Sequence, residues 1–218
     1  MLKIYGADLS SYANKVRMTA YSLGLEFDYQ KVSLRDGEHR KPDYLAIHPA
    51  GKIPAMDDDG FVLFESNAII KYLADKHNSS LYPQDRKKRA LIDQWMDFTT
   101  FHIGASLDRV AFNRIFAPRI GSPVDERSIK VGISFLNRFL PVLDEQLKKN
   151  KCLAGEDTTL ADINLVASLD AAEAAGVDLS KYENLWKHLQ DLRRQDFYIK
   201  CHRNYKEKLN QVFQPPKS

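Results

Sequence analysis

The sequence predicts two domains, an α/β domain with the element order βαβ-α-ββα and an all-helical domain after it. Strand-like runs alternate with helical periodicity over residues 1–78, and no convincing strand pattern follows them. A polar stretch with a proline, residues 79–87, separates the two regions and is typical of a linker. A length of 218 residues is sufficient for two small domains. We therefore expect domains at 1–78 and 88–218.

The chain begins with a β-α-β pattern. Leu2–Tyr5 is a short apolar strand candidate, and Phe27–Val32 mixes aromatic and β-branched residues that favour a second strand. Between them, apolar residues recur with helical spacing at Val16, Ala20 and Leu23. Gly24 is a suitable C-terminal cap for that helix. Two strands joined through a helix are expected to be parallel.

The rest of the first domain reads as a short helix, a hairpin and a longer helix. The short helix passes through Tyr44, and the hairpin pairs Ala55–Asp57 with Phe61–Leu63. Asp59-Gly60 between those strands is a strong turn signal. Ser66 is the expected cap of the next helix. The apolar face of that helix carries Ile69, Ile70, Leu73 and Ala74.

The second domain shows only helical patterns. Apolar and aromatic side chains recur at helical spacing at Leu91, Trp95, Phe98 and His102, at Leu136, Leu140, Leu143 and Leu147, and at Leu185, Leu189 and Leu192. Pro141 is a candidate kink within the second helix. Thr159–Asp162 resembles a capping box with Asp in place of Glu. Tyr205–Val212 predicts a last helix.

Composition and charge exclude several classes of function. The net charge of +3 is dispersed and does not indicate a nucleic-acid partner. No apolar run is long enough to cross a membrane, and the first ten residues lack a leader pattern, so we expect a cytosolic protein. Cys152 and Cys201 are far apart and are expected to be reduced thiols. The six histidines show no metal spacing, and no phosphate-binding glycine motif is present, so neither a metal nor a nucleotide is expected.

Two adjacent serines, Ser10 and Ser11, stand where the first helix should begin. Serine is a good helix N-cap, which would make both residues structural. A hydroxyl beside a helix N-terminus can also stabilise an anion. The local residues by themselves leave both interpretations open.

Three longer motifs, GEHRKPDYLAIHPAGKIPAM, LFESNAIIKYLADKH and LAGEDTTLADINL, resemble those of the cytosolic glutathione S-transferases. The resemblance covers essentially the whole chain. It is closest to the serine-type classes, which are the phi, delta and theta groups and their bacterial relatives. It implies a thioredoxin-like first domain that binds glutathione, a helical second domain, and no cofactor besides glutathione as co-substrate.

The resemblance also implies a catalytic serine at the start of the first helix, whose hydroxyl donates a hydrogen bond to the glutathione sulfur. Ser10 matches that position, and Ser11 remains a competitor. Tyr5 ends the first strand, where other classes carry their hydroxyl donor, and we interpret it mainly as a packing residue. No cysteine lies near Ser10, which disfavours a thiol-exchange role.

Several residues match positions that hold glutathione in the family. The implied peptide bond before Pro54 is cis, and Ile53 offers its backbone groups to the cysteinyl part. Glu65 and Ser66 match the pair that binds the γ-glutamyl end, where a carboxylate suits the ammonium group and helix N–H groups suit the carboxylate.

The glycyl carboxylate of glutathione calls for a cation. His39 and Lys52 match the positions that reach it in phi-like proteins. Arg40 or Lys41 could take the place of His39.

In the family an apolar pocket between the domains holds a hydrophobic electrophile. Its candidate residues here are Phe98, Phe101, His102, Phe112, Ile115 and Phe116. The resemblance implies a homodimeric detoxification enzyme that conjugates glutathione to such electrophiles. A non-catalytic binding protein of the same fold is the alternative, as is peroxidase, isomerase, dehalogenase or ether-cleaving activity with the same thiolate.

Overall fold

The chain divides into two compact units. In the computed structural model of the protein, residues 1–203 are described. The first unit comprises Met1–Tyr82 together with the described residues from Gln195 onward, and the second comprises Pro83–Arg194. The sequence analysis assigned residues 88–218 to the helical domain. The structure instead assigns the described residues from Gln195 onward to the first unit.

The first unit contains a four-stranded mixed sheet with the strand order β2-β1-β3-β4. The strands are β1 (Leu2–Gly6), β2 (Asp28–Lys31), β3 (Ala55–Asp58) and β4 (Phe61–Phe64). β1 pairs with β2 in parallel, as the β-α-β pattern predicts, while β3 is antiparallel to both β1 and β4. β1 alternates between buried and half-buried residues, because successive side chains point to opposite faces.

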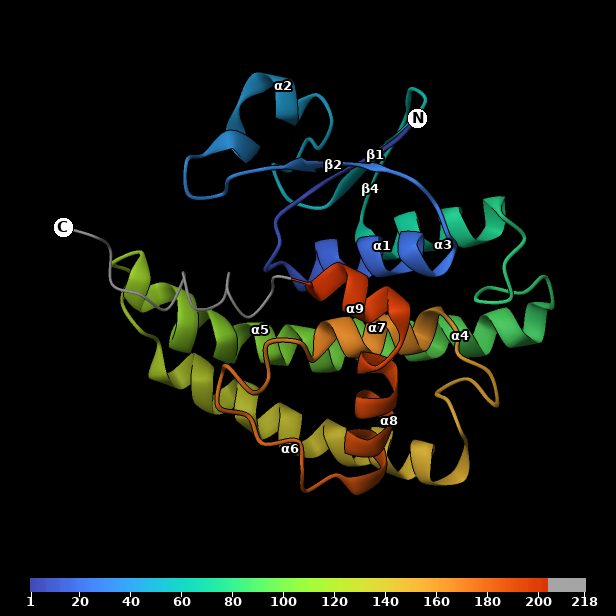
Figure 1. The fold of residues 1–218 in the computed structure, drawn as a ribbon. Coiled ribbons are helices and arrows are strands. Elements are labelled where there is room, and N and C mark those ends of the chain that lie inside the picture. Colours follow the sequence, from blue (N-terminus) through green and yellow to red (C-terminus); the bar gives the residue numbers. More distant parts are fainter. Residues whose placement is uncertain (204–218) are drawn as a thin grey trace. The chain divides into compact units, whose positions relative to one another are not determined.

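Helices cover both faces of this sheet (Figure 1). α1 (Ser11–Ser22) and α3 (Ser66–Lys76) pack together on one face, and α2 (Pro42–Leu45) lies on the other side. A short 3₁₀ helix, η1 (Glu38–Arg40), precedes α2. The predicted apolar residues of α3 are all buried. The βαβ-α-ββα order and the mixed sheet predicted for the first domain are therefore confirmed.

Local signals set the ends of these elements. The amide of Leu25 bonds the carbonyl of Ala20 and the amide of Gly24 bonds that of Tyr21, a Schellman motif that Gly24 permits with its φ of 67°. Asp59 and Gly60 both have positive φ, as a tight hairpin turn requires. The predicted cap and turn are therefore present.

The regular elements of the second unit are helices, and its loops carry one isolated β-bridge between Cys152 and Gly155. Its helices are α4 (Arg86–Phe98), η2 (Thr99–Gly104), α5 (Ala105–Ala111), η3 (Phe112–Phe116), η4 (Ala117–Arg119), α6 (Glu126–Lys149), α7 (Leu160–Ser168) and α8 (Glu183–Arg193). α7 is the core helix, because all of its residues from Leu160 to Ala167 are buried. Pro141 lies inside α6.

The first long helical stretch of this unit contains two π-helical segments, η2 and η3. The amide of Ala105 bonds the carbonyl of Thr100, and the amide of Ala117 bonds that of Phe112, each five residues back. The sequence pattern suggested regular helix here, and the wider turns are a finding of the structure.

α9 (Asp196–His202) belongs to the first unit and packs on α1. Phe197 and Cys201 are its buried residues. This packing explains the difference from the predicted domain boundary. The helix predicted at Tyr205–Val212 lies outside the described residues.

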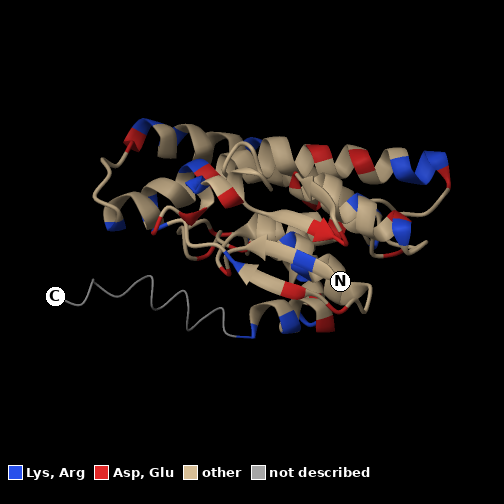
Figure 2. Cartoon of the chain, turned by 90° about the horizontal axis from the view of Figure 1, so that it is seen from above, with Lys and Arg blue, Asp and Glu red and all other residues tan. Residues whose placement is uncertain are grey.

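Basic and acidic residues are interspersed along the described helices (Figure 2). Within residues 1–203, no helix combines the length and the apolar character that a membrane crossing requires.

Candidate functional site

Ser10 occupies the N-cap position of α1. Its Oγ accepts a hydrogen bond of 3.3 Å from the amide of Ala13, and its backbone is extended, as an N-cap requires. The side chain is half-buried. Because the hydroxyl oxygen accepts in this bond, its proton is still available to a second partner. Ser11 is the first residue of the helix and is also half-buried.

Tyr5 lies on β1, opposite Ala55 of β3. Its ring packs edge-on against the ring of Tyr44, with 6.2 Å between the centroids. The hydroxyl of Tyr44 donates to the carbonyl of Lys52 at 2.7 Å. Tyr5 thus belongs to an aromatic layer that supports the loop before β3, which agrees with its predicted packing role.

The peptide bond between Ile53 and Pro54 is cis, as the resemblance implies. Ile53 is half-buried and Pro54 is buried immediately before β3. Lys52 is exposed. Gly51 has a φ of 59°, and a Cβ there would lie 2.8 Å from the carbonyl oxygen of His39. This close approach brings the backbone of His39 next to the turn that leads to Lys52.

His39 and its neighbours differ in exposure. His39 is half-buried in η1 and its Nδ1 is a buried atom without a hydrogen-bond partner. Arg40 and Lys41 are exposed. The three candidates are consecutive in the chain, and the backbone of His39 is the part that lies beside Gly51.

Glu65 and Ser66 form the start of α3, but the prediction that Ser66 caps this helix is wrong. The N-cap position is occupied by Glu65, and Ser66 is the first helical residue. Glu65 has a φ of 72° and a ψ of 109°, a conformation that costs an L residue about 1–3 kcal/mol and that occurs most often at functional sites. The Glu65 side chain is exposed and Ser66 is buried. Glu65 therefore immediately precedes the N-terminal turn of α3 without capping it through its side chain.

Lys15 connects the starts of the two helices. Its Nζ donates to Oδ1 of Asn67 at 2.6 Å, and the side chain of Lys15 is almost fully buried. Lys15 also lies over the ring of Tyr12, with 5.5 Å between Nζ and the centroid. α1, which Ser10 caps, and α3, which follows Glu65, are thereby joined through a charged hydrogen bond.

Sequence analysis missed His48, which is buried at 2% exposure. Its ring lies against Phe64, with a centroid distance of 4.7 Å, and stacks with Tyr44 at 6.5 Å. Burial lowers the pKa of His48, although the carboxylate of Glu65 partly opposes that effect. A neutral ring packed in this way supports the loop and does not supply a cation.

An open hollow of about 390 Å³ lies beside the segment that precedes Ser10. Its lining residues come from the ends of β1 and β2 and from η1, and they are Ala7, Asp8, Lys31, Val32, Ser33 and Glu38. Glu38 accepts a hydrogen bond of 2.7 Å from the amide of Ser33. Sequence analysis singled out none of these residues, because their positions become adjacent only when β1 and β2 pair.

In the second unit, five of the six predicted electrophile-contacting residues lie within the π-helical segments. They are Phe101 and His102 in η2, and Phe112, Ile115 and Phe116 in η3. Phe101 and Phe112 are exposed at 68% and 47%, whereas Ile115 is buried at 2%. Ile115 is therefore a packing residue, and Phe101 and Phe112 present open aromatic surface.

Phe98 and His102 belong to an aromatic cluster. Their rings are 5.1 Å apart, and both contact Phe139 of α6, at 5.9 Å and 4.7 Å respectively. Trp95 packs edge-on against Phe98. The structure thus brings together Phe98 and His102 and leaves Phe101 outside this cluster.

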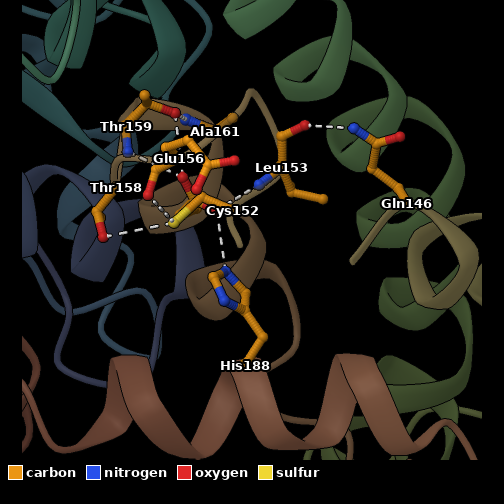
Figure 3. Close-up of polar contacts among 9 residues, drawn as sticks. Gln146, Cys152, Leu153, Glu156, Thr158, Thr159, Ala161 and His188 are labelled. Atoms are coloured by element: carbon orange, nitrogen blue, oxygen red, sulfur yellow. Dashed lines mark hydrogen bonds and ion pairs between the residues drawn. The ribbon is translucent and has the colours of Figure 1, made fainter. Parts of the chain in front are cut away.

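The capping box of α7 is present as predicted and is part of a larger polar network (Figure 3). Oδ2 of Asp162 accepts from the amide and hydroxyl of Thr159, at 2.8 and 3.1 Å, and Oδ1 accepts from the amide of Leu153 at 3.0 Å. Nε2 of His188 lies 2.9 Å from Oδ1 of Asp162. Burial and the charge of Asp162 raise the pKa of Cys152 to about 11.

Cys152, Asp162 and His188 place their possible ligand atoms within 4.8 Å of one another. Both oxygens of Asp162 already accept hydrogen bonds from the backbone amides of Leu153 and Thr159, and Nε2 of His188 faces Oδ1 of the same carboxylate. We assign this network to the stability of α7.

Two family models match the chain. The glutathione S-transferase N-terminal domain model matches residues 9–76, and the glutathione S-transferase C-terminal domain model matches residues 115–196. The two matches include Ser10, the 39–66 segment and the start of α7.

Solved structures resemble the chain over nearly its full length. Glutathione transferase F2 from Populus trichocarpa is 30% identical with a TM-score of 0.88, and the match covers 95% of this chain and 100% of that one. A delta-class glutathione transferase from Nilaparvata lugens is 32% identical with a TM-score of 0.86, covering 98% of each chain. Glutathione S-transferase-I bound with lactoylglutathione is 27% identical with a TM-score of 0.84, covering 92% of this chain and 97% of that one. The chain therefore belongs to the cytosolic glutathione S-transferase family and is a glutathione transferase enzyme.

Proposed function

We propose that this protein is a serine-type glutathione transferase in which Ser10 stabilises the glutathione thiolate. The observation that carries the proposal is the geometry of Ser10, whose oxygen caps α1 while its proton is available to donate. Ser10 stands at the N-terminal end of a twelve-residue helix, where the helix dipole favours an anion. Hydroxyl and dipole therefore act on the same sulfur.

The hydrogen bond from the hydroxyl and the helix dipole are together large enough to lower the pKa of the glutathione thiol. A free thiol has a pKa of about 8.5, and lowering it by about two units requires roughly 2.7 kcal/mol of preference for the thiolate. One hydrogen bond to a charged group supplies about 1.5–3 kcal/mol. The helix terminus adds up to about 1 kcal/mol. The thiol proton can leave to solvent, so this step needs no general base.

The rest of glutathione is proposed to lie along the first unit. Ile53 offers its backbone N–H and C=O to the cysteinyl part. Glu65 and Ser66 hold the γ-glutamyl end, where the Glu65 carboxylate pairs with the ammonium group. The unusual backbone of Glu65 supports this role. His39 and Lys52, whose segments meet at Gly51, bind the glycyl carboxylate.

We propose that the electrophile binds to the open aromatic surface of η2 and η3. Phe101 and Phe112 expose their rings, which favours a flat hydrophobic compound. The thiolate attacks the electrophilic carbon, a carbon–sulfur bond forms, and the leaving group departs with its bonding electrons. Catalysis then rests on positioning and on stabilisation of the thiolate. Conjugation of this kind is typical of detoxification.

A homodimer is part of the proposal. β4 is an edge strand of the sheet, and its residues Phe61, Val62 and Phe64 are exposed at 49%, 40% and 39%. An edge strand with exposed apolar side chains favours burial against another chain. Sedimentation of the purified protein tests this, and a monomer at micromolar concentration would contradict it. The cytosolic location stays a prediction from the sequence.

The decisive experiment is the ultraviolet absorbance of the glutathione thiolate, titrated against pH on the enzyme. Ser10→Gly is the variant, because glycine is a tolerated N-cap that lacks the hydroxyl. Ser11→Ala is the matched control. The proposal expects a bound thiol pKa well below its free value in wild type and Ser11→Ala, and a return toward it in Ser10→Gly. A thiol that binds with an unshifted pKa in wild type would favour a binding protein instead.

A further inference from the structure

The loop that carries Ser10 is held in place through Asp8, which lies two positions before Ser10. Nδ2 of Asn14 donates to the backbone carbonyl of Asp8 at 3.1 Å. The Asp8 carboxylate lies 3.6 Å from Nη1 of Arg17 and 3.1 Å from Nζ of Lys31. The amide of Ser10 bonds the carbonyl of Ala7 at 3.0 Å, which closes the loop.

Arg17 is the centre of these contacts. Its Nη1 donates to Oδ1 of Asn14 at 3.1 Å, so that one guanidinium orients the amide that holds Asp8. Its carbon Cζ lies 4.4 Å from the centre of the Tyr29 ring on β2. Arg17 is buried at 8% exposure, and Asn14 is fully buried.

The same guanidinium reaches the C-terminal helix of the unit. Nη2 of Arg17 donates to the carbonyl of Cys201 on α9 at 3.2 Å. The Cys201 thiol in turn lies 3.7 Å from the carbonyl of Asn14. Phe197 anchors α9 as its other buried residue. Residues 184 positions apart in the chain are thereby joined beneath the start of α1.

Arg17 stays charged in this setting. Burial by itself would lower its pKa, but the electrostatic interactions with Cys201, Tyr29, Tyr21 and Asp8 raise it above the ordinary value. A buried charge of this kind is stable only when its surroundings supply hydrogen bonds and opposite charge.

We propose that Arg17 is a positioning residue for the reaction, holding the Ser10 loop through Asn14 and Asp8 while α9 holds Arg17. The proposal rests on the proposed role of Ser10 as the donor to the glutathione sulfur. A hydrogen bond weakens steeply when its angle closes, so a small movement of this loop changes thiolate stabilisation. The planar, forked guanidinium supplies the two donor directions that Asn14 and Cys201 require, and a lysine ammonium does not.

The test compares Arg17→Met and Arg17→Lys with the matched control Lys31→Met. Lys31 pairs with the same carboxylate, but its side chain is 66% exposed and lies outside the Asn14–Cys201 contacts. The readout is the pKa of the glutathione thiol bound to each protein. Both Arg17 variants are expected to raise the pKa of the bound thiol by about one unit. At pH values well below that pKa, this lowers the amount of thiolate about tenfold. Lys31→Met is expected to leave the pKa unchanged.

Kinetics separate positioning from a general loss of structure. With glutathione and chlorodinitrobenzene, the Arg17 variants should lose roughly threefold in kcat at pH 7, because a rise of the bound thiol pKa from about 6.5 to about 7.5 lowers the thiolate fraction about threefold there. KM for glutathione should stay within about twofold. Raising the pH should restore much of the lost rate, because the missing thiolate forms at higher pH. Unchanged thiol pKa in both variants would overturn the proposal.

Two further measurements keep the proposal falsifiable if an Arg17 variant folds poorly. Phe197→Ala loosens α9 without touching Arg17 and is expected to raise the bound thiol pKa in the same direction. Amide hydrogen exchange at Ser10 should speed up in Arg17→Lys and not in Lys31→Met. If the wild-type thiol titrates at its free value, the role of Ser10 fails, and the exchange rates decide separately whether Arg17 holds the loop.

Discussion

Nε2 of His188 lies 2.9 Å from Oδ1 of Asp162, and both side chains are buried. The contact joins α8 to the N-terminus of α7, which is the core helix of the second unit. Asp162 therefore accepts hydrogen bonds from its own capping box, from the Leu153 amide and from a neighbouring helix. This one carboxylate therefore joins three segments of the second unit, which are the start of α7, the loop at Leu153 and α8.

Asp162→Ala is expected to be severely destabilising. It removes the acceptor of several buried donors, and leaving such groups unpaired costs roughly 3–5 kcal/mol in the free energy of unfolding. The loss should appear as a lower urea midpoint for the second unit, followed by circular dichroism. His188→Leu removes only one of the donors and should cost less.

Asp178→Ala is the matched control for that measurement. Asp178 also accepts hydrogen bonds from a nearby amide and hydroxyl, both of Ser180, but it is exposed. Its removal should shift the urea midpoint far less. Equal losses at the two positions would show that burial of the Asp162 network is not the reason for its importance.

The thiol of Cys152 is expected to be unreactive in the folded protein. Burial, with the nearby charge of Asp162, raises its pKa to about 11. At pH 8 a thiol with that pKa is ionised in only about one molecule in a thousand, and the thiolate is the reactive species. In Cys201→Ser, which leaves Cys152 as the only cysteine, a disulfide reagent should react slowly in buffer and rapidly in denaturant. Fast stoichiometric reaction in buffer would contradict the prediction.

Much of the fold was predictable because short signals fix its elements. Gly24 ends α1, Asp59-Gly60 turns the hairpin, and Thr159 caps α7, each through contacts within a few residues of the chain. The placement of α9 was not predictable in this way. Its contact with Arg17 spans 184 positions and depends on the folded α1, so the pattern of α9 alone could not assign it to the first unit.

The candidate site likewise contains some features that the sequence predicts and others that it does not. The sequence indicates Ser10 as a cap, and the structure confirms that capping bond. The backbone of Glu65 is different, because no local rule gives a glutamate a positive φ at an N-cap position. The π-helical segments η2 and η3 were also missed, since one wide turn hardly alters the spacing of apolar residues over a short window.

Asn164 is expected to stabilise the η2 segment. Its Nδ2 donates to the carbonyl of Met96 at 3.0 Å and to the hydroxyl of Thr100 at 3.3 Å, and the residue is fully buried. Asn164→Ala should cost about 2–4 kcal/mol, because it leaves a cavity and removes both bonds. Asn164→Leu fills the space and should cost only about 1–2 kcal/mol. Urea unfolding of both variants measures the difference, and equal losses would show that packing plays no part.

Asp58 is expected to make the stability of the first unit depend on acid pH. Its carboxylate accepts from Lys76 and from the hydroxyl of Tyr72 at 2.6 Å, which ties the end of β3 to α3. Those hydrogen bonds, with Lys76 the larger cause, lower the pKa of Asp58. A carboxyl whose pKa is lower in the folded than in the unfolded chain stabilises folding while it is ionised. The contribution is complete above the unfolded pKa of about 3.9 and is lost as the pH falls through the folded pKa.

Asp58→Asn should therefore lower the free energy of unfolding at neutral pH, and the difference from wild type should shrink as the pH falls below about 4. Tyr72→Phe, which keeps the Lys76 contact, should show a smaller difference with the same pH trend. Urea unfolding of the three proteins across the acid range measures both. A difference between wild type and Asp58→Asn that stays constant with pH would assign the effect to shape rather than to charge, because an amide and a carboxylate differ in charge only while the carboxyl is ionised.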